Sequence, residues 1–331
     1  MKTQKQTTLQ ISCTYSPNKP SSGIISYIMQ KAPPTPKGFR DILPEKAAKR
    51  RAVINTIAEV LEKEGFLPLE TPTIEFAETL TGKYGEEEKL IYKFKDRGDR
   101  ELALRYDLTV PLARFVANNQ NLLAKGPFRR YQIGQVFRGE NPQRGRYREI
   151  TQFDFDTVGS LNLLDDAKAI ATALKSVKKA GLSKAVILIN DRVNFEKTPI
   201  EVTRAIDKIA KIGEEGVREE LISKGLALDE IENHLFKIKN SKPTPSLVEI
   251  FKNLKDKYSL KENLDFIFDP TLARGLDYYT GAIFEMKPSN DPKELTIGAG
   301  GRYDNLIGTF AGRQIPAVGF SFGLDRIVDL L

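Results

Sequence analysis

Residues 128–158 constrain the fold most strongly, because two runs of alternating polar and apolar residues flank a loop that contains glycine and proline. The second run places Ile150, Phe153, Phe155 and Val158 between polar residues, and the first carries aromatic and aliphatic residues in a similar pattern. Alternation with a period of two on both sides of such a loop is typical of antiparallel strands. The sequence therefore predicts a long β-hairpin here.

Four arginines lie at the tip of this predicted hairpin. Arg138 ends the first strand, and Arg144, Arg146 and Arg148 lie in the connection. Planar guanidinium groups suit bidentate binding of phosphate or carboxylate. The hairpin could therefore cradle an anion, and a solvated hairpin tip is the alternative interpretation.

The composition excludes several kinds of site. Cys13 is the only cysteine, so neither an intrachain disulfide nor a thiolate metal cluster can form, which fits a reducing compartment. His234 is the only histidine and lies in a Lys/Glu/Asn-rich stretch, so a zinc site or a Ser-His-Asp triad is not expected. No apolar run is long enough to span a membrane. A formal charge of +7 is compatible with a polyanionic partner.

The N-terminal segment differs from the rest of the chain. Residues 1–28 are rich in Ser, Thr, Gln and Lys and contain no Asp, Glu or Arg. A segment without sustained periodicity is expected to be disordered, and we extend this predicted tail to residue 36. A transit peptide is one possible origin, although transit peptides are rich in arginine. We favour another origin, in which residues 1–28 are translated from a start codon upstream of Met29, because the sequence pattern of a complete domain begins at Met29.

The region before the long hairpin is expected to alternate between helix and extended chain. Apolar residues recur at helical spacing after Pro44, and Gly65 marks the end of that helix. Residues 66–75 are extended and contain prolines, which places them at an edge or an interface. A second hairpin pairs residues 90–94 with residues 102–106.

Two charged residues stand at predicted helix starts. Asp107 follows the second hairpin, where an aspartate commonly caps a helix, and it could also receive a substrate ammonium group. Arg326 lies in the first turn of the last helix, after a predicted strand. Because the helix dipole disfavours arginine there, we expect Arg326 to bind a partner.

Two later segments have a distinctive composition. Residues 195–263 are rich in Lys and Glu and show helical periodicity, which predicts a small helical insertion between core strands. Residues 297–303 are rich in glycine, which indicates close approach of the backbone to another group. This stretch matches neither the P-loop nor the dinucleotide-binding pattern.

Three segments, in this order, resemble the three motifs of the class II aminoacyl-tRNA synthetases. Residues 71–72 (Thr-Pro) are similar to motif 1, residues 137–140 (Phe-Arg-Gly-Glu) to motif 2, and residues 323–326 (Gly-Leu-Asp-Arg) to motif 3. Residues 274–281 and 299–304 resemble signatures peculiar to histidyl-tRNA synthetases. From about residue 37 onward, the chain is identified as a member of that family.

This resemblance implies a fold and an assembly. The fold class would be α+β, with a mainly antiparallel sheet flanked by helices in a catalytic domain at residues 37–331 and a helical insertion at about 195–263. Family enzymes continue past motif 3 into an anticodon-binding domain of on the order of 100 residues, which we expect to be absent from this chain. Motif 1 builds a homodimer interface in the family, so a homodimer is expected. The expected location of the protein is the cytoplasm.

The resemblance also implies histidine–tRNA ligation: ATP, accompanied by Mg²⁺, activates L-histidine to histidyl-adenylate, and histidine is then transferred to tRNA(His). Such catalysis consists of positioning and electrostatic stabilisation, which requires cations around the phosphates. By resemblance, Arg138 contacts the α-phosphate and the attacking carboxylate, and Arg146 and Arg326 hold the distal phosphates. Arg274 would lie by the α-phosphate, where related enzymes place a metal ion, so no protein side chain is assigned as a metal ligand.

The histidine pocket is assigned in the same way. Its expected side chains are polar or aromatic and are Asp107, Thr109, Gln152, Asp156, Arg274, Tyr279 and Tyr303. Asp107 and Thr109 match positions that bind the ammonium group, and Asp156 matches an acidic residue that addresses the imidazole. At both aspartates, family members commonly carry glutamate. Core packing is the alternative role of the two tyrosines.

The connection of the long hairpin meets the tRNA acceptor end in this family, and Gln143 and Arg148 match positions implicated there.

The alternative function is that of a synthetase-like regulatory subunit of ATP phosphoribosyltransferase, a paralogue that also lacks the anticodon-binding domain. A paralogue that does not activate histidine has no reason to keep every phosphate-binding arginine, and all are present here. A free-standing histidine-binding or histidine-adenylating module is a third possibility.

Overall fold

A mixed sheet forms the centre of the computed structural model, which describes residues 33–142, 147–273, 278–289 and 295–331. In this part of the chain, eight strands follow the order β1-β5-β6-β11-β10-β9-β7-β8. Their bounds, in that order, are Leu67–Pro68, Phe128–Phe137, Glu149–Val158, Ala317–Gly323, Gly298–Arg302, Ala282–Lys287, Val186–Asp191 and Phe266–Phe268. The pairs β1–β5 and β7–β8 are parallel and the others are antiparallel, so the predicted mainly antiparallel sheet is confirmed.

The long predicted hairpin is the β5–β6 pair. Its register runs from Phe128 opposite Val158 to Phe137 opposite Glu149. The alternating pattern divides β6 between two faces, because successive side chains of a strand point to opposite sides. Phe153 and Phe155 are fully buried on the apolar face.

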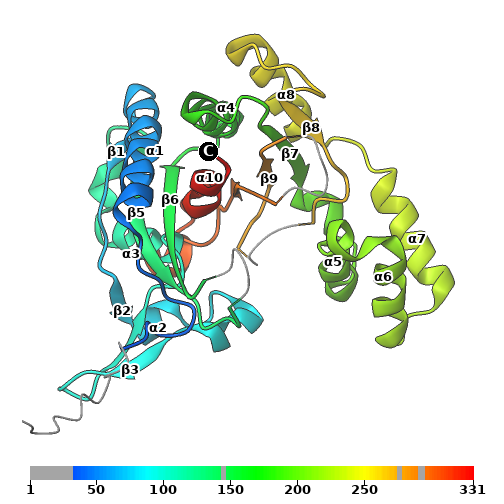
Figure 1. Cartoon of the computed structure of the whole chain (residues 1–331). Helices are drawn as coiled ribbons and strands as arrows, with labels where there is room; N and C mark the ends of the chain where they lie inside the picture. The colour runs from blue at the N-terminus through cyan, green and yellow to red at the C-terminus, as the bar shows by residue number, and fades with distance from the viewer. Residues whose placement is uncertain (1–32, 143–146, 274–277, 290–294) are drawn as a thin grey trace, which may run out of the picture. The chain divides into compact units, whose positions relative to one another are not determined.

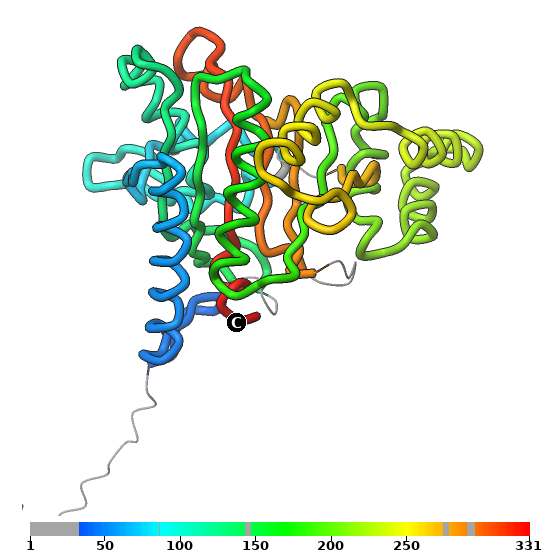
Figure 2. Tube along the Cα trace, turned by 90° about the horizontal axis from the view of Figure 1, so that it is seen from above, coloured from blue at the N-terminus to red at the C-terminus, as the bar shows by residue number. Residues whose placement is uncertain are grey.

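Helices cover this apolar face of the sheet. They are α1 (Pro44–Lys63), α4 (Leu163–Ala180), α8 (Pro245–Tyr258) and α10 (Leu324–Leu330). Their buried side chains form one core with the strand residues, and α4 lies between α1 and α8 (Figure 2). The face is therefore sealed by hydrophobic burial, which is the dominant favourable term in folding.

Helix α4 shows how the local sequence sets element boundaries. The Asn162 side chain accepts a hydrogen bond from the backbone N–H of Leu164 and so caps the helix start. Asp165 and Asp166 lie in the first turn, where the helix dipole favours negative charge. Gly181 ends the helix with φ of +123°, a conformation that glycine adopts at little cost.

The opposite face of the sheet is partly covered by a second group of elements. A smaller sheet has the order β2-β4-β3, and the nearby helices are short. The bounds are β2 Ile74–Phe76, β4 Glu101–Leu104, β3 Lys93–Lys95, α2 Ala77–Leu80, α3 Thr109–Asn118 and α9 Gly308–Ala311. The predicted extended segment at 66–75 thus supplies edge strands to both sheets, as its prolines require.

Residues 195–263 contain helices, as their periodicity predicts. Helices α5 (Ile200–Ile206), α6 (Ile209–Ser223) and α7 (Leu228–Lys239) share a small core of their own beside the sheet (Figure 1). Helix α8 also belongs to this range, but it packs on α4 in the main core. The separate helical module therefore consists of α5, α6 and α7.

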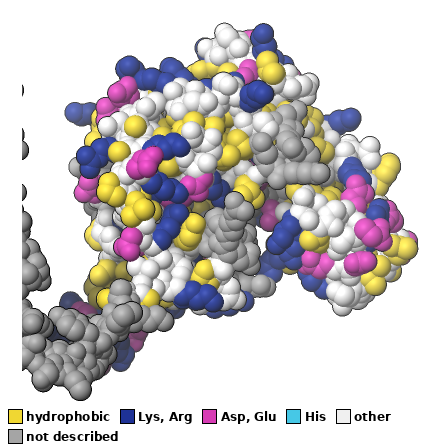
Figure 3. All heavy atoms as spheres, in the orientation of Figure 1, with side chains coloured by type: hydrophobic (Ala, Val, Ile, Leu, Met, Phe, Trp, Pro, Cys, Tyr) yellow, Lys and Arg dark blue, Asp and Glu magenta, His cyan; other side chains and the backbone are white. Residues whose placement is uncertain are grey.

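Short 3₁₀ helices connect the larger elements at Gly85–Leu90, Gln120–Leu123 and Arg192–Phe195. On the face drawn in Figure 3, basic side chains lie among acidic ones and form no single uninterrupted basic surface in the described part of the chain. Within the described residues, no helix combines the length and the apolar composition that crossing a bilayer requires.

Candidate active site

The second face of the central strands carries polar side chains or very small ones. Along β6 this face presents Gln152, Asp154 and Asp156, and the opposing residues of β5 are Gly134, Gln132 and Arg130. The opposing residues of β11 are Gly323, Ser321 and Gly319. A strand face without bulky apolar groups leaves room for a ligand above the sheet.

Two glycines on this face are required by close approach. A Cβ atom at Gly319 would lie 1.9 Å from the Oδ1 atom of Asp156, and one at Gly301 would lie 2.8 Å from the Cδ1 atom of Tyr279. Real Cβ contacts are essentially never that short. Gly301, from the glycine-rich stretch predicted to allow close approach, therefore makes space for Tyr279, and Gly319 on β11 makes space for Asp156.

Asp107 fills the helix-capping role considered for it from the sequence. Its Oδ1 atom accepts hydrogen bonds from the backbone N–H groups of Thr109 and Val110, at 3.1 and 3.0 Å, and from the Tyr84 hydroxyl at 3.0 Å. Its buried Oδ2 atom has no hydrogen-bond partner among the described residues. Burial raises the pKa of Asp107, and the nearby Arg138 guanidinium acts in the opposite direction. One oxygen thus caps α3, and the other is buried without a hydrogen-bond partner among the described residues.

Asp156 is held from two sides. Its Oδ2 atom lies 2.7 Å from the Nη2 atom of Arg130, a guanidinium with 0% exposure, and its Oδ1 atom accepts a hydrogen bond from the Tyr303 hydroxyl. Burial raises the pKa of Asp156, whereas Arg130 and the Tyr303 hydroxyl lower it. We infer an ionised carboxylate, since a buried charge paired with a guanidinium has its partner in place.

Two further acceptors lie on the same strand. The Gln152 side chain donates to the Ser321 hydroxyl at 2.9 Å, which leaves its buried Oε1 atom without a partner among the described residues. In the same described set, Asp154 has an unpartnered Oδ1 atom. Burial raises the pKa of Asp154 to about 7, although Arg130 and Ser321 act in the opposite direction. The site is therefore rich in acceptors, which suits a ligand that is cationic and rich in N–H donors.

Tyrosines connect these carboxylates. The Tyr278 ring lies 4.9 Å from the Tyr279 ring and 5.8 Å from the Tyr303 ring, measured between centroids. The Tyr278 hydroxyl is hydrogen-bonded to the Thr109 side chain. Burial raises the pKa of Tyr278 and Tyr303 well above the usual value, so both hydroxyls stay protonated. The three rings form an aromatic cluster between Asp107 and Asp156.

The predicted arginines occupy different surroundings. Arg138 donates from Nε to the backbone oxygen of Tyr106 at 3.2 Å and lies over that ring, 4.5 Å from its centroid. Arg326 donates to the backbone oxygen of Thr296 at 2.6 Å. Arg148 donates from Nε to the Glu140 backbone oxygen at 3.0 Å. Arg138 also acts on Asp107, because its charge opposes the rise in the pKa of Asp107 that burial causes.

The structure thus brings together five of the predicted pocket residues, namely Asp107, Thr109, Asp156, Tyr279 and Tyr303. Gln152 lies on the same strand face as Asp156. The predicted site residues Gln143, Arg146 and Arg274 lie outside the described residues. No group of three or more His, Cys, Asp or Glu side chains in the described ranges is arranged to hold a metal ion.

Sequence reasoning missed Arg130, Asp154 and Tyr84. Asp154 could have been found, because the period of two in β6 places it on the same face as Gln152 and Asp156. Arg130 lies on the matching face of β5, but a basic residue near the start of a strand gives no sign of full burial. Tyr84 reaches Asp107 from a turn outside every recognised motif.

Comparisons with known proteins identify similar chains. The family model described as histidyl-tRNA synthetase matches residues 38–197 and 200–327. A curated relative from Aeropyrum pernix, named histidine–tRNA ligase, is 43% identical over 325 residues, which cover 90% of this chain and 74% of that protein.

Solved structures agree with this result. Histidyl-tRNA synthetase from Nostoc sp. PCC 7120 shares 29% identity with a TM-score of 0.76, and the match covers 90% of this chain and 75% of that one. A Bacillus halodurans protein described as an ATP phosphoribosyltransferase regulatory subunit/histidyl-tRNA synthetase shares 25% identity with a TM-score of 0.73, and the match covers 90% and 83%.

Proposed function

Since the chain belongs to the histidyl-tRNA synthetase family, we propose that the site described above ligates L-histidine to tRNA(His). The observation that carries this proposal is the set of buried acceptor atoms without hydrogen-bond partners among the described residues, at Asp107, Gln152, Asp154 and Asp156, the last of which is ion-paired with Arg130. Histidine offers an ammonium group and an imidazole N–H, which are the donors that such a set requires.

The ammonium group of histidine binds Asp107. The Oδ2 atom of Asp107 is buried and lacks a partner among the described residues, whereas its Oδ1 atom is fixed by α3 and Tyr84. A carboxylate held in this way is already oriented before the ligand arrives, which reduces the entropic cost of binding. Thr109 and Gln152 supply further acceptors for the ammonium group in this proposal.

The imidazole ring binds between Asp156 and the tyrosines. Asp156 is kept in place by Arg130 and the Tyr303 hydroxyl and accepts the imidazole N–H, while Tyr279 and Tyr303 flank the ring. An amino acid without an imidazole would leave these buried polar groups unpaired. Sites of this kind discriminate by roughly 10⁴-fold or more without editing.

Activation proceeds by attack of a histidine carboxylate oxygen on the α-phosphorus of ATP. The new bond is the acyl–phosphate bond of histidyl-adenylate, and the bond to pyrophosphate breaks. Arg138 lies close enough to Asp107 to lower its pKa, which supports a role in binding the carboxylate and α-phosphate of a histidine held there. Arg146 and Arg326 bind the distal phosphates, and Arg274 stabilises charge at the α-phosphate.

Mg²⁺ accompanies ATP in this proposal and supplies charge neutralisation on the phosphates. The described residues contain no cluster of three or more His, Cys, Asp or Glu that would hold a metal by itself. The triphosphate oxygens would hold this ion, since oxygen ligands of this kind suit Mg²⁺.

The second step transfers histidine from the adenylate to the 3′ end of tRNA(His). Gln143 and Arg148, in the connection of the long hairpin, contact the acceptor end. Arg148 is held by the Glu140 backbone oxygen, which supports an ordered position for its side chain.

The enzyme acts as a cytoplasmic homodimer in this proposal. Apolar side chains are exposed on the edge strands β1 and β2, where Leu67 is 61%, Ile74 is 44% and Phe76 is 50% exposed. Exposed apolar groups that cluster on edge strands are typical of an interface. A single cysteine in the chain fits a reducing compartment.

The alternative function, a synthetase-like regulatory subunit of ATP phosphoribosyltransferase, is not favoured. The relative named histidine–tRNA ligase shares 43% identity, whereas the structure whose description also names that regulatory subunit shares 25%.

An aminoacylation assay with purified tRNA(His), ATP and labelled histidine tests the proposal. We expect ATP-dependent charging of tRNA(His), and a folded protein that charges no tRNA would contradict it.

A further inference from the structure

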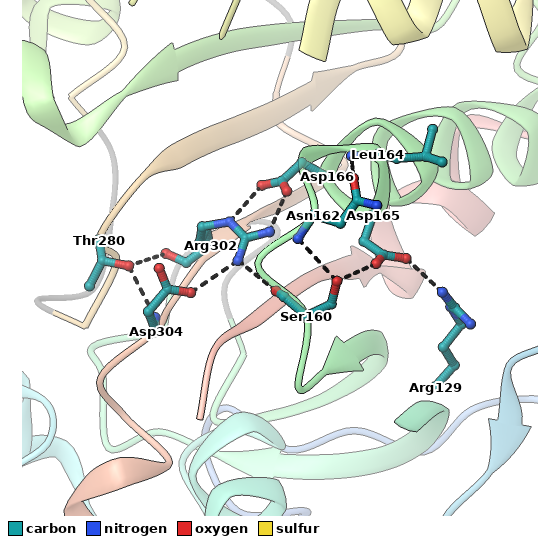
Figure 4. A network of polar contacts seen from close by, with 9 residues as sticks. All are labelled: Arg129, Ser160, Asn162, Leu164, Asp165, Asp166, Thr280, Arg302 and Asp304. Atoms are coloured by element: carbon teal, nitrogen blue, oxygen red, sulfur yellow. Dashed lines mark hydrogen bonds and ion pairs between the residues drawn. The ribbon is translucent and has the colours of Figure 1, made fainter. Parts of the chain in front are cut away.

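A buried ion pair lies behind the aromatic cluster, on the helix side of the sheet. Arg302 ends β10 and is 5% exposed, and Asp166 lies in the first turn of α4 with 0% exposure. The guanidinium donates from Nε to Asp166 Oδ1 at 3.0 Å and from Nη2 to Asp166 Oδ2. Figure 4 shows this bidentate ion pair, which joins β10 to α4.

The third donor nitrogen of Arg302, Nη1, forms hydrogen bonds with two other segments. This atom donates to the backbone oxygen of Ser160 at 3.0 Å and to Asp304 Oδ1 at 3.1 Å. Arg302 therefore connects the turn before α4, the start of α4 and the chain beyond β10, as Figure 4 shows. A guanidinium with this many fixed acceptors has little rotational freedom.

The network continues into the turn that carries two of the tyrosines. The backbone oxygen of Arg302 accepts a hydrogen bond from the Thr280 backbone N–H at 2.8 Å. The Thr280 hydroxyl accepts one from the Asp304 backbone N–H at 3.0 Å. Tyr278 and Tyr279 directly precede Thr280, so their backbone is fixed through Arg302 and Asp304.

Arg302 and Tyr303 lie next to each other but point to opposite sides, because successive side chains alternate along an extended chain. Arg302 reaches α4 on the helix side, and Tyr303 reaches Asp156 on the site side. Gly301, the other neighbour of Arg302, is packed against Tyr279. Fixing Arg302 thus fixes the backbone from which both tyrosines are positioned.

Replacing a buried ion pair by apolar residues often costs little stability. An ion pair at this position therefore needs a reason beyond stability, and geometric definition of the neighbouring backbone supplies one. Catalytic and binding groups require support of this kind to within about 0.5 Å.

We propose that Asp166 and Arg302 are positioning residues for histidine recognition, acting through Thr280 and Tyr303. This inference rests on the proposed function, because it assigns the tyrosines to the histidine pocket. Asp166 and Arg302 touch no substrate. Their effect is on the histidine half of the site, and the ATP half does not depend on them.

The test is histidine-dependent ATP–pyrophosphate exchange, measured with histidine and ATP varied separately. In Asp166→Asn we expect the KM for histidine to rise roughly 10- to 100-fold, as small displacements in an active site do, while the KM for ATP changes less than twofold. Thr280→Val removes the hydroxyl of the turn without burying a charge, and it should give the same selective rise. It serves as the second variant if Asp166→Asn does not fold.

The matched control is Arg129→Met. Arg129 pairs with the neighbouring Asp165 at 2.7 Å and is 30% exposed in its side chain. This pair reaches Arg302 only indirectly, because Asp165 accepts a hydrogen bond from the Ser160 hydroxyl and the Ser160 backbone oxygen accepts one from Arg302. Since Arg129 itself contacts neither Arg302 nor Thr280 in the network of Figure 4, both KM values should stay within twofold of the wild type. Equal changes of both KM values in Thr280→Val, or unchanged values, would overturn the inference. Absence of exchange in the wild type would instead contradict the proposed function itself.

Discussion

Arg130 and Asp156 are directly opposed residues of β5 and β6, and their side chains form an ion pair of 2.7 Å in the protein interior. Arg130 also leaves Nε and Nη1 without hydrogen-bond partners among the described residues. The pair links the long hairpin to the candidate pocket, because Asp156 also receives the Tyr303 hydroxyl. Its consequences for stability and recognition can be measured.

Replacing Arg130 by methionine should destabilise the protein strongly. The change leaves the buried Asp156 without its cation, and breaking one partner of a buried pair costs about 3–5 kcal/mol. Urea unfolding at pH 7 measures this loss. Arg129, whose side chain is 30% exposed, provides the control, since Arg129→Met should cost about 1 kcal/mol or less. Equal losses of unfolding free energy in the two variants would show that the buried Arg130 contributes no more to stability than Arg129 does.

Asp107→Asn separates the two roles of Asp107. The amide oxygen can still cap α3, but the negative charge that would bind the ammonium group is lost. We expect the unfolding midpoint to change little, while kcat/KM for histidine falls about 100-fold, which corresponds to about 2.7 kcal/mol. A variant with normal kcat/KM would limit Asp107 to capping. Steady-state pyrophosphate exchange provides the measurement.

Asp154 should make stability depend on pH. Burial raises its pKa to about 7, so between the ordinary value of 3.8 and pH 7 the folded state holds a proton that the unfolded state has lost. Stability from this group therefore falls as pH rises through that window. Asp154→Asn removes the effect, so the variant should gain about 2–3 kcal/mol over the wild type between pH 5 and pH 8.

Urea unfolding of both proteins at pH 5, 6, 7 and 8 gives this difference directly. Other titrating groups cancel in the comparison, provided that they do not contact Asp154. A difference that stays constant across the series would show that Asp154 is ionised throughout.

Phe76→Asp should dissociate the proposed homodimer. Phe76 is 50% exposed on the edge strand β2, and a charge there would have to be desolvated in an interface. Sedimentation velocity should show a dimer for the wild type and a monomer for the variant. Phe236 on α7 is 67% exposed and provides the control, because Phe236→Asp should stay dimeric. A monomeric wild-type protein would refute the proposed homodimer.

The sequence predicted those parts of the fold that depend on local patterns. Alternation in residues 128–158 predicted β5 and β6, and α1 ends just before Gly65, as the helix-stop rule predicted. Gln152 and Asp156 were assigned by resemblance, and the structure places them on one strand face.

The rest depends on long-range packing, which no local pattern encodes. Arg130 has 0% exposure, and its side-chain contacts come from other segments, at Asp156 and at the Leu108 backbone oxygen. Likewise, α8 has the charged surface and periodicity of the helical insertion, but it belongs to the main core because it packs on α4. The Asp166–Arg302 pair joins residues 136 positions apart, and neither residue is special in its own segment.

Activation of histidine by this protein can be measured directly as ATP–pyrophosphate exchange with single amino acids. Purified protein is incubated with ATP and labelled pyrophosphate, with histidine or another amino acid supplied in turn. We expect exchange with histidine and exchange lower by about 10⁴-fold with amino acids that lack an imidazole. Equal exchange with other amino acids, or no exchange by folded protein, would contradict the account.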